Sequence, residues 1–115
     1  MKYQLLHNPR CRKSRESLLF LKSNKIDFKV ISYLIDKLDR NELKKIIKNS
    51  GLSITDFIRT QEKIWKSSLK KKQLSENEIL QVLEKNPKLI QRPIFFSNKK
   101  SVIANPPEKV FEVIN

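Results

Sequence analysis

Cysteine, glycine and histidine are scarce in this chain, and each shortage excludes a class of site. Cys11 is the only cysteine, so a disulfide framework within the chain is excluded. One histidine and one cysteine are too few for a structural zinc site, and Gly51, as the only glycine, excludes a glycine-rich phosphate loop of the usual kind. We therefore expect no bound metal and no internal disulfide.

Long hydrophobic runs are also missing. No apolar run approaches the roughly 20 residues that a membrane helix requires, and the apolar part of the N-terminal stretch is too short for a signal peptide. A length of 115 residues with 38% hydrophobic residues suits one small core. We expect a single domain over residues 1–115, located in the cytoplasm and without a membrane partner.

Acidic residues are few: the chain has 12 Asp and Glu residues and 25 Lys and Arg residues, which gives a formal net charge of +13. Such a balance favours anionic partners and raises the hypothesis of nucleic-acid binding. The basic residues are, however, spread over the chain and are not interleaved with aromatic residues as stacking platforms would be. We interpret the charge as a lysine-rich solvated surface and do not expect nucleic acid as a partner.

The remaining pattern predicts an α/β fold. Tyr3–Leu6 and Phe28–Leu34 are predicted strands, separated by a helix predicted from about Ser14 to Ser23. A right-handed crossover makes these two strands parallel. Ile94–Phe96 and Ser101–Ala104 are predicted to form a hairpin before a last helix. The order is βαβ, then helices, then ββα.

Helix signals dominate the middle of the chain, over about residues 38–87. Asp39, Ser53 and Ser75 are each followed three residues later by an acidic residue, as in a capping box. Gly51 lies where the first of these helices should stop. We therefore expect a helical insertion between the two strand-containing halves.

Cys11 has the clearest chemical context in the sequence. It follows a predicted strand and a proline turn and lies at the predicted start of a helix, where unsatisfied N–H groups and the helix dipole favour negative charge. Arg10, Arg12, Lys13 and Arg15 flank it, and such surroundings lower the pKa of a thiol from about 8.5 to about 3.5–7.5. A buried structural cysteine is the alternative interpretation. The position and the basic flanks favour a reactive thiol, whose neighbouring N–H groups could also bind a tetrahedral oxyanion.

His7 and Ser14 are candidates to support this thiol. His7 could tune the thiol or hold the turn, and Ser14 could hydrogen-bond the thiolate or cap its helix. Cys11 and Ser14 form a C-x-x-S pattern, so the chain has no second thiol to resolve an oxidised Cys11. A catalytic cycle would need an external thiol such as glutathione or a glutaredoxin.

Four segments of the chain resemble motifs of one family, the glutathione/glutaredoxin-coupled arsenate reductases. The active-site segment is matched by His7–Glu16, the mid-chain arginine motif by Phe57–Thr60, the Arg-Pro-Ile motif by Ile90–Ile94 and the terminal segment by Ala104–Val110. The matches follow the order of the family and span nearly the whole chain. The resemblance implies a thioredoxin-like fold with a helical insertion.

The resemblance also implies a mechanism without a bound cofactor. The Cys11 thiolate would attack arsenate, external glutathione would resolve the thiol–arsenate adduct and release arsenite, and glutaredoxin would reduce the mixed disulfide. Arg59 and Arg92 match family arginines that hold the oxyanion, for which the planar guanidinium fork is suited. Surface salt bridges are the alternative for both arginines. The family also implies a cis peptide bond between Arg92 and Pro93.

Supporting roles carry over to the other matched positions, which are His7, Asn8, Ser14, Arg15, Pro93 and Asn105. One of them departs from the family, because Asn105 stands where the family has a third arginine. Asparagine suits an N-cap, so we expect Asn105 to cap the last helix, with Pro106 as the first helical residue. It cannot supply the charge, and the loss of one donor from an oxyanion site can cost a factor of about 10²–10³ in rate. The expected substrate is therefore arsenate or another small oxyanion.

Relatives with this fold suggest an alternative function. Spx-type transcription factors bind RNA polymerase and sense redox through a C-x-x-C switch. Ser14 occupies the second cysteine position here, so that disulfide switch cannot form. A redox-independent regulator that binds RNA polymerase is the alternative to the enzyme.

Overall fold

The structure, a computed structural model, describes residues 2–34, 38–69 and 73–114. Contacts between its residues divide the chain into two compact units. The first consists of Met1–Asp36 and Arg92–Asn115, and the second of Lys37–Gln91. In sequence, the second unit is thus enclosed by the two halves of the first.

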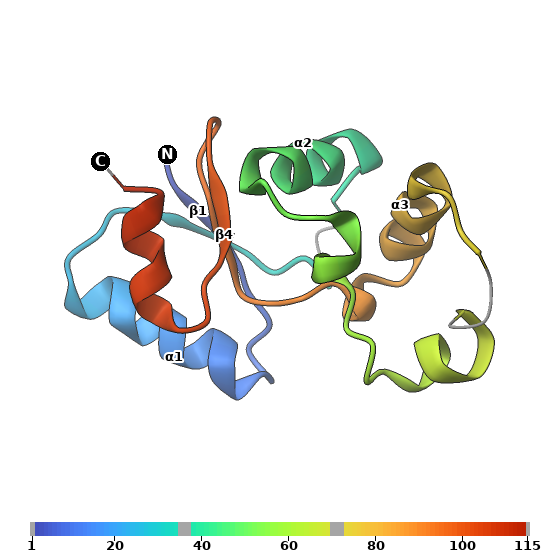
Figure 1. The fold of residues 1–115 in the computed structure, drawn as a ribbon. Helices are drawn as coiled ribbons and strands as arrows, with labels where there is room; N and C mark the ends of the chain where they lie inside the picture. The colour runs from blue at the N-terminus through green and yellow to red at the C-terminus, as the bar shows by residue number, and fades with distance from the viewer. Residues whose placement is uncertain (1, 35–37, 70–72, 115) are drawn as a thin grey trace. The chain divides into compact units, whose positions relative to one another are not determined.

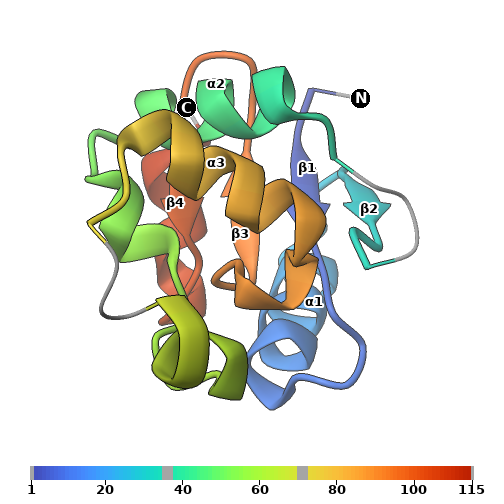
Figure 2. The ribbon, with the colours of Figure 1, turned by 90° about the vertical axis from the view of Figure 1, so that its right-hand side faces the viewer.

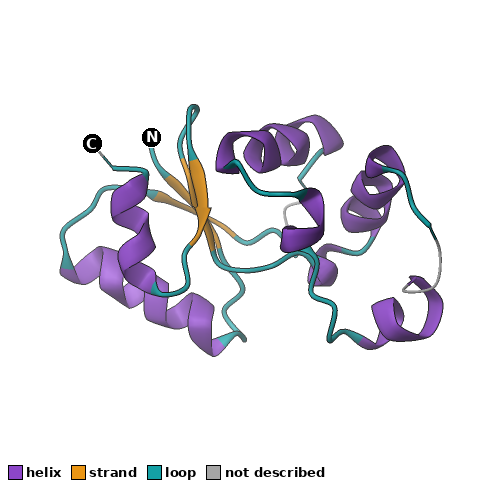
Figure 3. Ribbon diagram, in the orientation of Figure 1, coloured by secondary structure: helices purple, strands orange, loops and turns teal. Residues whose placement is uncertain are grey.

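A four-stranded sheet forms the centre of the first unit. Its strands are β1 (Gln4–Leu6), β2 (Lys29–Ile31), β3 (Ile94–Phe96) and β4 (Ser101–Ile103), in the order β2-β1-β3-β4. β1 pairs parallel with β2 and antiparallel with β3, and β3 pairs antiparallel with β4. The predicted βαβ and ββα halves are both present, and the chain between them in sequence forms helices and loops (Figure 3).

β2 is shorter than the sequence pattern predicts. The pattern extends to Leu34, but the strand ends at Ile31, and Tyr33 and Leu34 lie in a turn. Tyr33 is nevertheless fully buried. The apolar alternation beyond Ile31 therefore reflects a turn whose Tyr33 side chain is buried, and not a longer strand.

The strand register brings three segments of the chain to one end of the sheet. Leu6 pairs with Ile94, and Ile94 pairs with Ile103. Because β3 runs antiparallel to both β1 and β4, the residues that follow β1, precede β3 and follow β4 meet at this end. Cys11 and Arg92 belong to these segments.

One face of the sheet is covered by α1 (Arg12–Ser23) and η4 (Pro107–Glu112), which lie side by side in Figure 1. α1 begins slightly before its predicted start near Ser14. Phe20 and Phe111 join the two helices edge to face, with ring centroids 5.7 Å apart. The core beneath them combines residues from both ends of the chain, namely Leu5, Leu21, Phe95, Val102, Ala104, Val110 and Val113. Burial of this apolar surface is the main favourable term in the folding of the unit.

The start of the last helix differs from the prediction. η4 begins at Pro107, and its N-cap is Pro106, whose backbone is extended at φ −69° and ψ 162°. Pro106 itself precedes a proline, and this disfavours helical dihedral angles at that position. Pro107 therefore takes the first helical place, for which proline is suited. The expectation that Asn105 caps this helix is wrong, and Asn105 lies exposed one residue before the cap.

The second unit is built of short helices. They are α2 (Arg40–Ser50), η1 (Ile54–Phe57), η2 (Trp65–Leu69), α3 (Glu76–Lys85) and η3 (Pro87–Leu89). η2 is a π-helix, whereas η1 and η3 are 3₁₀-helices. α2 and α3 lie next to each other (Figure 2). Their buried apolar residues are Leu43, Ile46, Ile47, Ile79, Leu80 and Leu83.

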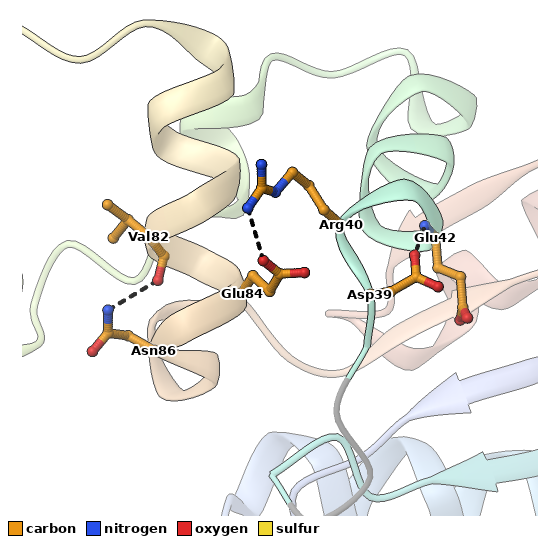
Figure 4. A network of polar contacts seen from close by, with 6 residues as sticks. All are labelled: Asp39, Arg40, Glu42, Val82, Glu84 and Asn86. Atoms are coloured by element: carbon orange, nitrogen blue, oxygen red, sulfur yellow. Dashed lines mark hydrogen bonds and ion pairs between the residues drawn. The ribbon is translucent and has the colours of Figure 1, made fainter.

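Capping groups fix the ends of these helices largely as predicted. The Asp39 carboxylate accepts the Glu42 N–H at 2.8 Å (Figure 4). Ser53 and Ser75 each form a complete capping box. Gly51 ends α2 in the left-handed conformation at φ 74°, which a residue without Cβ adopts without steric cost. The helical middle of the chain is thus confirmed.

An ion pair joins the two longer helices of the second unit. Arg40 Nη2 donates to Glu84 Oε1 at 3.0 Å, and Asn86 closes α3 by donating to the Val82 carbonyl at 3.0 Å (Figure 4). Both charged side chains are partly exposed, so the ion pair by itself stabilises the unit little. The apolar faces of α2 and α3 therefore contribute most to this packing.

Candidate active site

The turn from Asn8 to Cys11 is fixed by a set of hydrogen bonds. Pairing of β1 continues through His7, whose N–H donates to the Ile31 carbonyl at 2.9 Å. The Cys11 N–H donates to the Asn8 carbonyl at 3.0 Å, and the Arg10 N–H donates to Asn8 Oδ1 at 3.0 Å. Asparagine is suited to such a turn because its side chain hydrogen-bonds the backbone two residues on. The turn therefore delivers Cys11 to a defined place at the end of the sheet.

Cys11 is the N-cap residue of α1, with an extended backbone at φ −95° and ψ 123° and a half-buried side chain. Burial acts to raise the pKa of its thiol. The backbone N–H of Ser14, the Arg92 guanidinium and the backbone N–H of Lys13 outweigh burial, so the pKa lies below its ordinary value. These three groups favour the charged form of the thiol, although the Cys11 side chain makes no cap hydrogen bond at the start of α1. The geometry suits thiolate chemistry, and the catalytic role of Cys11 stays a prediction.

Ser14 is fully buried and connects the helix to the preceding turn. Its Oγ lies 2.6 Å from His7 Nδ1 and accepts the Asn8 N–H at 3.0 Å. The hydroxyl thus holds the chain before Cys11, a role that the sequence does not predict.

His7 is buried as well, and burial is the main reason that its pKa lies below the ordinary value. The charges of Arg15 and Lys22 lower the pKa further, while the hydrogen bond with Ser14 opposes the shift. The imidazole is therefore neutral at pH 7. Of the two roles considered for His7, the geometry favours holding the turn.

The cation that bears on the Cys11 sulfur comes from far along the chain. Arg15 Nη1 donates to the Pro9 carbonyl at 2.9 Å, so Arg15 holds the turn. Arg12 pairs with Glu16 at 3.1 Å and is 86% exposed. Arg92 is the side chain whose charge favours the thiolate. The basic residues beside Cys11 in sequence are therefore a weaker indication of a reactive thiol than the sequence suggests, because the cation that lowers the pKa of Cys11 is Arg92.

The segments on either side of the β3–β4 hairpin are tied together at the same end of the sheet. The Arg92–Pro93 peptide bond is cis, as the family resemblance implies, and the Asn105–Pro106 bond is also cis. The buried Pro93 accepts the Ala104 N–H at its carbonyl at 2.9 Å. Ser17 of α1 donates to the Ala104 carbonyl at 2.7 Å. The bond between Pro93 and Ala104 holds together the backbone next to Arg92 and the backbone next to Asn105.

Arg59 belongs to the second unit, where its side chain is half-buried. Its N–H donates to the Leu89 carbonyl at 2.7 Å, and the adjacent Ile58 forms an antiparallel bridge with Ile90. The mid-chain arginine motif is thus paired with the residues that lead, in sequence, to Arg92. The contact of Arg59 with an oxyanion stays a prediction.

Among the described residues, no three His, Cys, Asp or Glu side chains gather as a candidate metal site. No helix within residues 2–34, 38–69 and 73–114 is long and apolar enough to cross a membrane. Within the first unit, the candidate site consists of the Cys11 thiol, the N-terminus of α1 and the Arg92 guanidinium.

Comparison with known proteins relates the chain to arsenate reductases. A model of the ArsC family matches residues 6–113. The chain is 35% identical over 112 residues to an arsenate reductase of Haemophilus influenzae, covering 96% of this chain and 97% of that protein. It is 39% identical over 113 residues to the uncharacterized protein YfgD of Escherichia coli, covering 96% and 95%. A solved arsenate reductase from Vibrio cholerae matches with a TM-score of 0.92 at 35% identity, covering 99% and 98%.

Regulatory proteins are also among the relatives. The regulatory protein MgsR of Bacillus subtilis is 30% identical over 106 residues, covering 91% of this chain and 84% of that protein. The global transcriptional regulator Spx of Streptococcus mutans is 30% identical over 100 residues, covering 86% and 73%. Proteins named as arsenate reductases and proteins named as regulators are thus both similar to this chain in sequence.

Proposed function

Because the chain belongs to the ArsC family, we propose that it is an arsenate reductase in which the Cys11 thiolate is the nucleophile. The family and its arsenate reductase members support a thiol-dependent oxidoreductase in general. The finer proposal is carried by one observation, the place of Cys11 at the N-terminus of α1 beside the Arg92 guanidinium. The thiolate is the reactive form of cysteine, and these groups favour it.

In the proposed reaction, the Cys11 thiolate attacks the arsenic of arsenate. A sulfur–arsenic bond forms, and one arsenic–oxygen bond breaks as that oxygen leaves as water after protonation. The thiolate of glutathione then attacks the Cys11 sulfur. The electron pair of the sulfur–arsenic bond stays on arsenic, which is reduced from the +5 to the +3 state and leaves as arsenite. Cys11 and glutathione are left as a mixed disulfide, so the two electrons come from the two thiols.

The oxyanion would be bound by groups that the site already orients toward negative charge. The backbone N–H groups of Lys13 and Ser14 lie at the start of α1, where a helix attracts anions. Arg92 adds a guanidinium, whose planar fork matches two oxygens of a tetrahedral anion. Asn105, in contrast, brings no charge to the third family position. Because the N–H groups and Arg92 suit a tetrahedral anion, we propose a small oxyanion as the substrate class, with arsenate as the first candidate.

The return of Cys11 to the thiolate needs an external thiol, because Ser14 stands where a resolving cysteine could be. We propose glutathione as this thiol and glutaredoxin as the protein that reduces the mixed disulfide. Neither would be a bound cofactor. The cationic surface, at a net charge of +13, favours the approach of anionic glutathione.

A coupled assay tests the proposal. Arsenate-dependent oxidation of NADPH is measured in a mixture of the protein, glutathione, glutaredoxin and glutathione reductase, with Cys11→Ser beside the wild type. We expect turnover in the wild type and none in Cys11→Ser. An absence of turnover from protein whose Cys11 still alkylates quickly at slightly acidic pH would assign the thiol to another substrate.

A regulatory function is the second candidate, favoured by the similarity to MgsR and Spx. It would be independent of a disulfide switch, because Cys11 has no partner cysteine in the chain. Co-purification of RNA polymerase subunits with the tagged protein would support this function. The same experiment with Cys11→Ser separates the two candidates, since a redox-independent regulator should retain its partner.

A further inference from the structure

Two serines of α1 are fully buried, and their hydroxyl groups serve different parts of the molecule. Ser17 donates to the Ala104 carbonyl at 2.7 Å, in the segment after β4. Ser14 lies 2.6 Å from His7 Nδ1 and accepts the Asn8 N–H at 3.0 Å. Both contacts of Ser14 are with the chain that leads to Cys11. A buried polar group keeps such partners because leaving one of them unpaired is costly.

Ser14 is connected to Cys11 by two routes. Its backbone N–H belongs to the donors at the start of α1 that favour the thiolate. Its hydroxyl holds Asn8, and the Asn8 carbonyl accepts the Cys11 N–H at 3.0 Å. The helix and the turn therefore both fix Cys11 relative to the same serine.

His7 orients the Ser14 hydroxyl. The imidazole is neutral at pH 7, because burial lowers its pKa. The Asn8 N–H already occupies one lone pair of Ser14 Oγ. In the tautomer with the ring proton on Nε2, the Ser14 O–H donates to His7 Nδ1 while Ser14 Oγ accepts the Asn8 N–H.

We propose that Ser14 is a positioning residue whose hydroxyl, oriented by His7, holds the turn from Asn8 to Cys11 so that the sulfur stays at the N-terminus of α1. The inference rests on Cys11 as the reactive thiol of the proposed function, but not on arsenate as the substrate. The serine of the C-x-x-S pattern then keeps a single thiol reactive, instead of merely replacing a second cysteine.

Alkylation tests this role directly. Because Cys11 is the only cysteine, the rate of its reaction with iodoacetamide reports on this thiol alone. The rate is measured from about pH 5 to about pH 9, which gives the midpoint of thiolate formation. The variants are Ser14→Ala, Ser14→Thr and Ser17→Ala. Ser17→Ala is the matched control, because it removes an equally buried hydroxyl from the same helix without touching the turn.

We expect Ser14→Ala to move the midpoint to higher pH and to slow alkylation at acidic pH by about threefold or more. Ser17→Ala should leave the midpoint in place, and Ser14→Thr, which keeps the hydroxyl, should lie nearer to the wild type than Ser14→Ala. An unchanged midpoint in Ser14→Ala, or an equal shift in Ser17→Ala, overturns the proposal.

Circular dichroism shows whether each variant is folded. If Ser14→Ala does not fold, His7→Leu takes its place, since it removes the partner that orients the hydroxyl. An unchanged midpoint in folded His7→Leu then overturns the proposal. These measurements need no arsenate, so a failure of the reductase function and a failure of this inference are distinguishable.

Discussion

Replacing Arg92 by glutamine should make Cys11 a slower nucleophile at acidic pH. The Arg92 guanidinium favours the Cys11 thiolate through both its charge and a hydrogen bond. Arg92→Gln keeps an N–H donor but removes the charge. The fold should tolerate the change, since the adjacent backbone is held by the bond between Pro93 and Ala104.

The size of the effect follows from the exposure of the two groups. Two unit charges about 4 Å apart interact by about 4 kcal/mol at an effective dielectric constant of about 20. Exposed ion pairs, in contrast, contribute only about 0–1 kcal/mol, because water screens them. Cys11 and Arg92 are both half-buried, so we expect about 1 kcal/mol, near the lower of these limits. This corresponds to about a fivefold smaller fraction of thiolate at a pH below the midpoint.

The assay is the pH dependence of Cys11 alkylation, with Arg12→Gln as the control. Arg12 is next to Cys11 in sequence and carries the same charge, but it is 86% exposed and pairs with Glu16. Arg92→Gln should slow alkylation at slightly acidic pH by about fivefold, whereas Arg12→Gln should change it by less than about twofold. Equal effects of the two substitutions would refute the reasoning, because general surface charge would then account for the activation.

Three further predictions concern the third family position, a helix end and the buried histidine. Asn105→Arg should raise kcat/KM for arsenate by about tenfold or more, because it adds a charged donor to the oxyanion site; an unchanged or lower value in the coupled assay would contradict this. Gly51→Ala should lower the free energy of unfolding by about 1–2 kcal/mol, since φ is 74° although no atom lies within 4 Å of the added Cβ; equal urea midpoints would argue against backbone strain. The lowered pKa of His7 means that the unfolded chain binds more protons below the ordinary value of 6.5, so stability should fall as the pH falls through this value. His7→Leu should flatten the dependence between about pH 7 and about pH 5.5, and an unchanged slope in urea unfolding would exclude His7 as its source.

The ends of the helices in the second unit are predictable from sequence because their causes are local. The side chains of Asp39, Ser53 and Ser75 each accept a hydrogen bond from a backbone N–H within three residues. Gly51 ends α2 because glycine adopts the left-handed backbone conformation without steric cost. The last helix shows how a local rule can be misapplied. Two adjacent prolines compete for the first helical place, and the restriction that Pro107 imposes on the preceding residue decides the outcome.

The candidate site is predictable only in part. The place of Cys11 at the start of a helix follows from the turn and helix signals around it. Its partners depend on tertiary structure, since Arg92 reaches the sulfur through the pairing of β1 with β3. The bond between Ser14 and His7 depends on how the turn folds back over the helix. Neither contact can be predicted from composition or from the spacing of residues, and only the family resemblance singles out Arg92.

The enclosure of the second unit by the two halves of the first has a consequence for synthesis on the ribosome. β1 can meet β2 early, but its other edge is completed by β3, which lies beyond the entire helical segment. At about 5–20 residues per second, translation of that segment takes several seconds. During this time the nascent chain carries an uncovered strand edge and a half-built core, while its helices can already form. A chain whose central strand pairs only with its neighbours in sequence would not expose such an edge for so long during synthesis.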